Sequence, residues 1–313
     1  MIIDSHAHLM AKGWSHDRTT LAYARVVAAT MGKVTGEYPE TDGIVTNLIP
    51  LSYDPTGEKL IAAMDLAGVE ISCIFPTDFG LATGEPEVPI EDQNRMIAEA
   101  AKRFPGRLVP FFAIDPRRGG SSDMFARAVE DWGMRGLKLH PTSGFFPNDE
   151  ACYPLYEKCI EYGFPVVTHT GGILAPLKCL YTSPVYVDAV AADFPELPII
   201  MAHAGMAYWL EVLMIAMNKP NVYLDFSALE TLLVDHPGIF YPRLRRFIDD
   251  LGPWRVFFGS DSPLFNFVCP IDAWVKAFAE PDLSSCPDVS FTEEEKEIVL
   301  GKAFARLMGI QAT

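Results

Sequence analysis

The chain has 313 residues, of which 49% are hydrophobic and 21% charged, and its formal net charge is −16. This length allows one large buried core. The excess of 41 acidic over 25 basic residues argues against nucleic acid and anionic membranes as partners. A small anionic substrate stays compatible with this charge, because the local charge of a pocket decides what binds there.

The sequence also bears on membranes and redox state. No apolar stretch is long enough to span a bilayer. We expect no signal peptide, because the first apolar run reaches a charge at Asp4. The six cysteines show no Cys-x-x-Cys spacing, so we expect reduced thiols in a cytoplasmic protein.

The chain begins with an apolar run, residues 1–3, that predicts a first strand ending at His8. No regular strand–helix unit follows in the next fifty residues. Residues 19–31 are typical of a helix, and residues 37–54, rich in Pro, Gly and Asp, are typical of a loop. Insertions of this length are commonly functional. We therefore expect residues 9–58 to form an insertion that covers the mouth of the fold.

From residue 57 onward, apolar strands alternate with amphipathic helices. With the first strand, this gives eight strands and predicts a single-domain α/β protein, a (β/α)₈ TIM barrel over residues 1–313 with a C-terminal helix. An open doubly wound sheet is the alternative, but no G-x-G-x-x-G sequence follows a strand. The predicted strands are 71–76, 108–114, 136–140, 165–169, 198–203, 222–226 and 255–261. The predicted helices are 57–67, 89–104, 121–132, 151–162, 184–194, 207–217, 242–251, 271–278 and 292–308.

Histidines and one aspartate recur at the ends of these strands, where the active sites of such barrels lie. Chance does not explain this clustering, because buried parallel strands are mostly aliphatic. Imidazole nitrogens and a carboxylate suit Zn²⁺ or a similar divalent ion, which activates a bound water. The strand-end residues are His6, His8, Lys138, His140, His169, His203 and Asp261. We assign the two other histidines, His16 and His236, to loops without a role.

Five short motifs resemble the amidohydrolase superfamily. More narrowly, they resemble its amidohydrolase-related branch, which includes aminocarboxymuconate-semialdehyde decarboxylase. The branch holds hydrolases, decarboxylases and hydratases, so the resemblance specifies the fold more closely than the reaction. The motifs are DSHAH at 4–8, GLKLHP at 136–141, PVVTHTG at 165–171, MAHAG at 201–205 and FGSDSP at 258–263.

The resemblance implies a role for each strand-end residue. It gives the metal ligands as His6, His8, His169 and Asp261. His203 would hydrogen-bond the metal-bound water or the substrate, and Asp261 would be the catalytic acid/base. We expect one divalent ion, with zinc ahead of manganese. The alternative is two ions bridged by a carbamylated Lys138, and His140 is expected to contact the second ion or, preferably, the substrate.

The leading functional expectation is a metal-dependent hydrolase of a small amide, lactone or ester. The alternative is a non-oxidative decarboxylase of a small aromatic or conjugated carboxylic acid, which needs a cation for the substrate carboxylate. Arg18, Arg25 and Lys33 are available for that purpose, but none lies in a recognisable motif. A metal-free binding protein on the same barrel is a third reading, disfavoured because no ligand position is missing.

Further residues near strand ends have two readings, either packing at the barrel top or lining an apolar pocket. Asp225 is a candidate for substrate contact, whereas Glu230 is expected to be solvated or to cap a helix. The Met- and aromatic-rich helix around residues 208–217 is a candidate interface of a homodimer. The aromatic residues concerned are Phe79, Phe145, Phe146, Trp209, Phe265 and Phe267.

Overall fold

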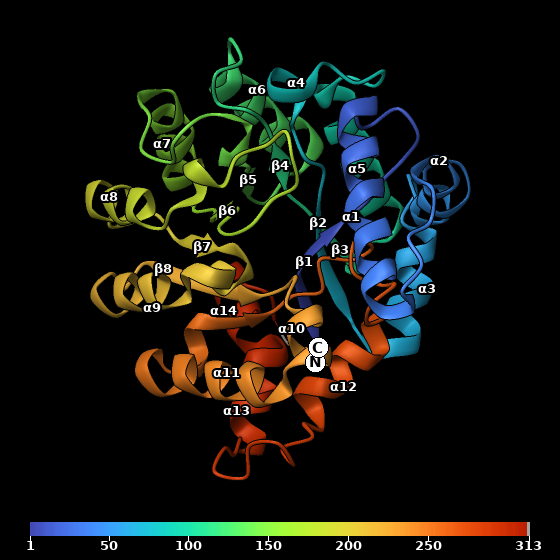
Figure 1. The fold of residues 1–313 in the computed structure, drawn as a ribbon. Helices are drawn as coiled ribbons and strands as arrows, with labels where there is room; N and C mark the ends of the chain where they lie inside the picture. Colours follow the sequence, from blue (N-terminus) through green and yellow to red (C-terminus); the bar gives the residue numbers. More distant parts are fainter. Residues whose placement is uncertain (312–313) are drawn as a thin grey trace.

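The structure, a computed structural model that describes residues 1–311, has a ring of parallel strands surrounded by helices (Figure 1). Strands that follow one another along the chain pair in parallel, except that the third and fourth do not pair with each other. The predicted (β/α)₈ barrel is confirmed, with one barrel strand divided in two. The strands are β1 (Ile3–His8), β2 (Ile71–Phe75), β3 (Leu108–Pro110), β4 (Phe112–Ala113), β5 (Leu137–Leu139), β6 (Val166–Thr168), β7 (Ile199–Met201), β8 (Val222–Phe226) and β9 (Val256–Phe258).

The division falls within the predicted strand 108–114. Pro110 has no N–H to donate, which interrupts the ladder at that residue. The next two backbone N–H groups donate to the two neighbouring strands in turn. Phe111 N donates to Ile74 O in β2, and Phe112 N donates to Gly136 O just before β5. The sheet therefore stays continuous across β3 and β4 although neither strand pairs on both sides.

The barrel closes between β1 and the segment after β9. Ala7 forms a parallel bridge with Ser262, and Asp261 N donates to His6 O at 2.8 Å. The buried carboxylate of Asp4 strengthens this seam. It accepts from His6 N (3.0 Å), Ser260 N (2.9 Å) and Ser260 Oγ (2.6 Å). Closure thus places the His6–His8 end of the first strand beside Asp261.

The helices lie outside the ring and cover the strands on all sides (Figure 1). A capping box opens the helical segment near the C-terminus, since Thr292 and Glu295 each bond the other's backbone N–H. The helices are α1 (Asp17–Thr35), α2 (Thr41–Gly43), α3 (Glu58–Ala67), α4 (Gly80–Thr83), α5 (Ile90–Arg103), α6 (Ser121–Arg127), α7 (Tyr153–Tyr162), α8 (Val185–Asp193), α9 (Trp209–Asn218), α10 (Glu230–Asp235), α11 (Pro237–Leu251), α12 (Ile271–Ala279), α13 (Glu293–Glu297) and α14 (Ala303–Met308).

The segment between β1 and α3 is more regular than expected. Residues 37–54 were expected to be a loop, and this is wrong: α2, a π-helical turn (Ile44–Leu48) and a 3₁₀ turn (Ile49–Ser52) follow one another there. Ile44 and Ile49 are buried against the inner face of α1. Burial of these two side chains favours compact helical turns over an open loop, despite the local Gly and Pro.

The outward face of α9 carries the residues proposed for a subunit interface. Leu210, Met214 and Met217 are all more than half exposed there. Their exposure is compatible with the homodimer, which stays a prediction. None of the helices within residues 1–311 is long and apolar enough to cross a membrane.

Replacing Asp4 with Ala should lower the free energy of unfolding by about 2–4 kcal/mol, because buried N–H donors of His6 and Ser260 would lose their acceptor. Urea denaturation measures this as a lower midpoint. The exposed Asp288→Ala variant is the control and should change stability by less than about 0.5 kcal/mol. Equal midpoints for the two variants would show that the seam does not depend on this carboxylate.

Candidate metal centre

The barrel brings the seven strand-end residues together at the carboxyl ends of the strands. His6 and His8 come from β1 and Lys138 from β5, and the others lie within three residues after the ends of β5, β6, β7 and β9. All seven are at most 7% exposed. Among the described residues, His6, His8 and Asp261 form one compact group of ligand atoms within 4.8 Å. His6, His203 and Asp225 form a second such group.

Hydrogen bonds fix the proton positions on His6 and His8. His6 Nδ1–H donates to Asp225 Oδ2 at 2.9 Å, and His8 Nδ1–H donates to Phe75 O at 3.0 Å. The Nε2 atom of each neutral ring therefore carries a lone pair. Burial lowers the pKa of His6 well below its usual value, which favours this neutral form.

Asp261 faces both of these nitrogens. Its Oδ1 lies 3.5 Å from His6 Nε2 and 3.1 Å from His8 Nε2. This buried oxygen finds no hydrogen-bond donor among the described residues. Ligand atoms held about 2.1 Å from one ion lie about 3.0–3.5 Å apart. The arrangement, an unpaired carboxylate oxygen facing two lone pairs, therefore fits a divalent cation.

A second pair of imidazoles lies beside the first. His169 Nε2–H donates to Gly172 O at 3.1 Å, so its Nδ1 is left with a lone pair. That atom lies 3.0 Å from His203 Nε2. His203 Nδ1 is 2.8 Å from Ser227 Oγ, whose hydroxyl donates to Asp225. His169 Nδ1 and His203 Nε2 thus face each other with a lone pair on each atom. A shared proton or a bound cation would remove the repulsion between these lone pairs.

His169 belongs to neither compact group, although the resemblance implies that it is a ligand. His203 separates it from His6. Burial lowers the pKa of His169 to about 3 and that of His203 well below its usual value, so both rings favour the neutral state that metal ligation requires.

Lys138 lies beneath the group, fully buried. Its Nζ is 3.2 Å from His6 Nε2, to which it donates, and it lies over the Phe75 ring. Burial lowers the pKa of Lys138 to about 8, so a substantial fraction of the amine is neutral near physiological pH. A metal ion at His6 would take over the lone pair that Lys138 now uses.

His140 lies against His169. The two imidazoles stack with centroids 4.0 Å apart, and Phe79 packs edge-on against His140 at 4.6 Å. His140 Nδ1 is 2.7 Å from Thr142 Oγ1. These contacts leave the ring at the cavity wall, where a substrate is within its reach.

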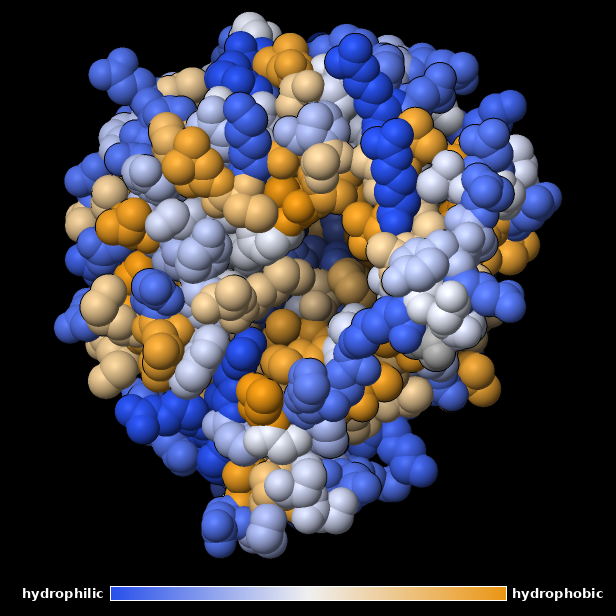
Figure 2. All heavy atoms as spheres, viewed as in Figure 1, coloured by the Kyte–Doolittle hydropathy of each residue, from blue (hydrophilic) through white to orange (hydrophobic). Residues whose placement is uncertain are grey.

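A cavity of about 1100 Å³ opens above the histidines. Figure 2 shows its mouth as a hollow in the middle of this face, with an apolar rim and hydrophilic atoms deeper inside. Side chains from two stretches of the inserted segment, within residues 9–26 and 45–53, supply part of its wall. Of the six aromatic residues considered above, Phe79 and Phe265 line the cavity, and Phe145 is buried in the core.

The remaining three aromatic residues do not reach the cavity. Phe146 packs on Tyr181 and Tyr186, Trp209 packs on Phe247, and Phe267 is 45% exposed.

The cationic residues expected to face a substrate are elsewhere. Arg18, Arg25 and Lys33 do not line the cavity, and Lys33 pairs with Asp235 on α10. Lys12 lines the cavity and makes no ion pair with any described residue. Arg18 and Arg25 do not reach the cavity because both lie on the exposed face of α1, where their side chains point to solvent.

The structure places four further residues that the sequence analysis considered. Asp225 is fully buried and holds His6, the backbone N–H of His203 and Ser227. Glu230 was expected to be solvated or to cap a helix, and neither is the case. It is 1% exposed, burial raises its pKa well above the usual value, and α10 has Leu229 at its N-cap without a side-chain cap hydrogen bond. His16 accepts from Arg18 N at the start of α1 and lines the cavity, and His236 is exposed.

Comparison with known proteins identifies the family of this chain. Residues 3–310 match the family model described as Amidohydrolase. The chain belongs to this amidohydrolase family. No curated protein gave a significant match.

Solved structures similar to this amidohydrolase share its fold at low sequence identity. An uncharacterized TIM-barrel protein from Bordetella bronchiseptica aligns with a TM-score of 0.68 and 22% identity, covering 99% of this chain and 98% of that one. 5-Carboxyvanillate decarboxylase from Sphingomonas paucimobilis aligns with a TM-score of 0.66 and 18% identity, covering 99% of this chain and 99% of that one. A dihydroxybenzoic acid decarboxylase from Polaromonas sp. JS666, solved with bound manganese and 2-nitroresorcinol, aligns with a TM-score of 0.67 and 16% identity. The alignment covers 100% of this chain and 98% of that one.

Replacing Asp225 with Asn should weaken manganese or zinc binding by about 10–100-fold, because His6 would lose the carboxylate that fixes its Nδ1–H. Titration against a chromophoric chelator measures the affinity. The control, Asp272→Asn, removes an exposed carboxylate on α12 and should leave affinity unchanged. Unaltered affinity in Asp225→Asn would mean that this hydrogen bond does not orient a metal ligand.

Proposed function

We propose that this amidohydrolase is a metal-dependent, non-oxidative decarboxylase of a small aromatic carboxylic acid. The observation that carries the proposal is the unpaired Asp261 Oδ1, which faces the Nε2 atoms of His6 and His8 at the floor of a largely apolar cavity. Such a donor set suits a divalent ion, and such a cavity suits a flat ring.

One divalent ion, held by His6, His8, His169 and Asp261, is the arrangement we favour. Nitrogen and carboxylate ligands suit both zinc and manganese. Manganese is the first to test, because the similar dihydroxybenzoic acid decarboxylase was solved with that metal. A second ion on a carbamylated Lys138 has less support, since Lys138 lies against His6 and the Phe75 ring.

The proposed reaction replaces the carboxylate of the substrate with a proton. An ion held by these residues would supply positive charge that binds the substrate's oxygens. Asp261, as the acid, delivers a proton to the ring carbon that bears the carboxylate. The bond between that carbon and the carboxylate then breaks, its electron pair restores the ring, and CO₂ leaves. A solvent proton then restores the acid form of Asp261, so one proton is consumed for each CO₂ released.

The neighbouring histidines would position the substrate. His203 is held by Ser227 and Asp225, so its ring cannot rotate freely. His140, stacked between His169 and Phe79, presents an edge to the cavity. Both rings are neutral because burial lowers the pKa of each well below its usual value. They would therefore orient the substrate without adding charge. The lone pair of His203 Nε2 would accept a hydrogen bond from a substrate hydroxyl or a bound water.

Hydrolysis, the reaction expected first from the sequence, has weaker support. Solved structures similar to this chain include several decarboxylases of aromatic acids. The unpaired Lys12 at the cavity also suits a carboxylate-bearing substrate, whereas an uncharged amide or lactone has no use for it. Decarboxylation is therefore the better proposal, although the family match by itself is compatible with either reaction.

The manganese-loaded protein should release CO₂ from one or more members of a panel of hydroxybenzoates, measured by gas-phase mass spectrometry. Removing the metal with a chelator should abolish release, and Asp261→Asn should lower kcat by about 10²–10⁴-fold. The same panel should include aryl lactones and anilides, scored by base uptake. Acid production from these compounds without CO₂ from any benzoate would overturn the proposal in favour of hydrolysis.

Replacing Lys12 with Met should raise KM for the aromatic acid about threefold to tenfold with little change in kcat. An exposed ammonium contributes mainly to substrate binding, in the ground state and transition state alike. Steady-state kinetics separate the two constants. The control, Arg18→Met, removes a cation of the same segment outside the cavity and should leave KM and kcat unchanged. Equal rises in KM in the two variants would mean that the net charge of the protein, and not Lys12 at the cavity, causes the effect.

A further inference from the structure

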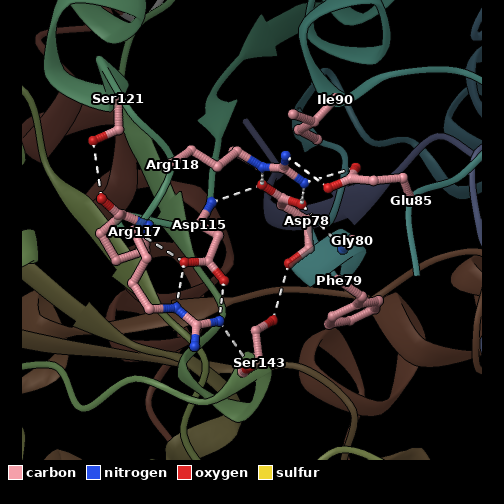
Figure 3. A network of polar contacts seen from close by, with 12 residues as sticks. Asp78, Phe79, Gly80, Glu85, Ile90, Asp115, Arg117, Arg118, Ser121 and Ser143 are labelled. Carbon is pink, nitrogen blue, oxygen red and sulfur yellow. Dashed lines mark hydrogen bonds and ion pairs between the residues drawn. The ribbon is translucent and has the colours of Figure 1, made fainter. Parts of the chain in front are cut away.

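An ion network joins the segments after β2 and β4 at one wall of the cavity (Figure 3). The Arg118 guanidinium lies between two carboxylates and binds each through two hydrogen bonds. Its Nε and Nη2 donate to Asp78 at 2.6 and 2.8 Å. Its Nη1 and Nη2 donate to Glu85 at 2.9 and 3.0 Å. Each of the two pairs has the bidentate geometry in which Arg binds a carboxylate of any origin.

The two carboxylates differ in what holds them. The Asp78 side chain is 3% exposed, and it also accepts from the backbone N–H groups of Asp115 (2.8 Å) and Gly80 (3.2 Å). The Glu85 side chain is 54% exposed, and Arg118 is the partner that the structure gives it. Asp78 is therefore a fixed part of the fold, whereas Glu85 is an exposed group seated on the outer edge of Arg118.

Glu85 separates the guanidinium from the cavity. Glu85 lines the cavity, and Arg118 does not. Gly80 makes the close approach possible, because a Cβ atom at that position would collide with both Arg118 Nη2 and Glu85 Oε2. Glu87 lines the same wall and adds a further carboxylate. The wall thus presents negative charge to a ligand, although a guanidinium lies directly behind it.

We propose that Glu85 determines the charge of the substrate that this wall accepts. With its carboxylate on Arg118, the wall admits a substrate whose far end is uncharged, hence an aromatic monocarboxylate. Without that carboxylate, the outer edge of Arg118 becomes a binding site for a second carboxylate on the ring. This inference rests on the proposed function for the aromatic acid, and it adds the substrate class.

The geometry favours removal of Glu85 without loss of the fold. Ion pairs with an exposed partner contribute little to stability. The buried pair of Arg118 with Asp78, which would be costly to break, remains intact in such a variant. Arg117, which binds Asp115 and joins the loop after β4 to the loop after β5 through Ser143 O and Gly144 O, is untouched (Figure 3).

The test compares two ligands that differ by one carboxylate, 3-hydroxybenzoate and 5-hydroxyisophthalate, on the manganese-loaded protein by calorimetry. The unaltered protein should prefer the monocarboxylate. Glu85→Ala should bind the dicarboxylate about tenfold more tightly and change the monocarboxylate by less than about threefold. Glu87→Ala, the matched control, removes a carboxylate from the same wall without freeing a guanidinium and should gain less than about threefold.

A second readout needs no aromatic ligand. Arg118 should react with phenylglyoxal faster in Glu85→Ala than in the unaltered protein or Glu87→Ala, as measured by peptide mass spectrometry. Equal rates would overturn the masking of Arg118 by Glu85. A preference of the unaltered protein for the dicarboxylate, or an equal gain in both variants, would overturn the selection by charge. Neither readout depends on turnover, so the absence of CO₂ release would count against the proposed function alone.

Discussion

The hydrogen bond from His6 Nδ1–H to the buried Asp225 carboxylate is the interaction on which the candidate metal centre depends. It directs the Nε2 lone pair of His6 toward Asp261, and the other oxygen of Asp225 holds the backbone of His203 and the Ser227 hydroxyl. One carboxylate thereby sets the orientation of two imidazoles from different strands. Such a second layer of contacts is what gives a metal ligand its direction and its basicity.

The centre concentrates polar groups where burial penalises charge. Burial lowers the pKa of His6, His140, His169 and His203, so the rings are kept neutral without a compensating anion for each. The backbone at the centre is also unusual. The non-glycine residues with positive φ in the described chain are His203, Ala204, Met206, Ala228 and Asp261, and all follow β7, β8 or β9. Conformations of this kind persist at functional sites because the surrounding structure holds them.

The cavity wall combines fixed and adjustable charges. Asp78 and Asp115 are buried and bind two consecutive arginines, which fixes the loops after β2, β4 and β5 relative to one another. Glu85 and Lys12 are exposed groups at the same cavity. Rigid loops with exchangeable outer residues are the means by which one barrel supports different substrates.

The sequence alone determined the barrel and the members of the centre, because the two-residue periodicity of a strand and the common edge of parallel strands are local rules. His6, His8, His169, His203 and Asp261 were predicted from their positions at strand ends. Tertiary structure decided which atoms face one another. It placed Asp225 where it fixes the tautomer of His6, and it placed His203 between His6 and His169. It also buried Glu230. Likewise, Lys12 and Glu85 meet the cavity only because the inserted segment and the loop after β2 fold over the same mouth. Long-range packing sets such contacts, and no spacing along the chain encodes them.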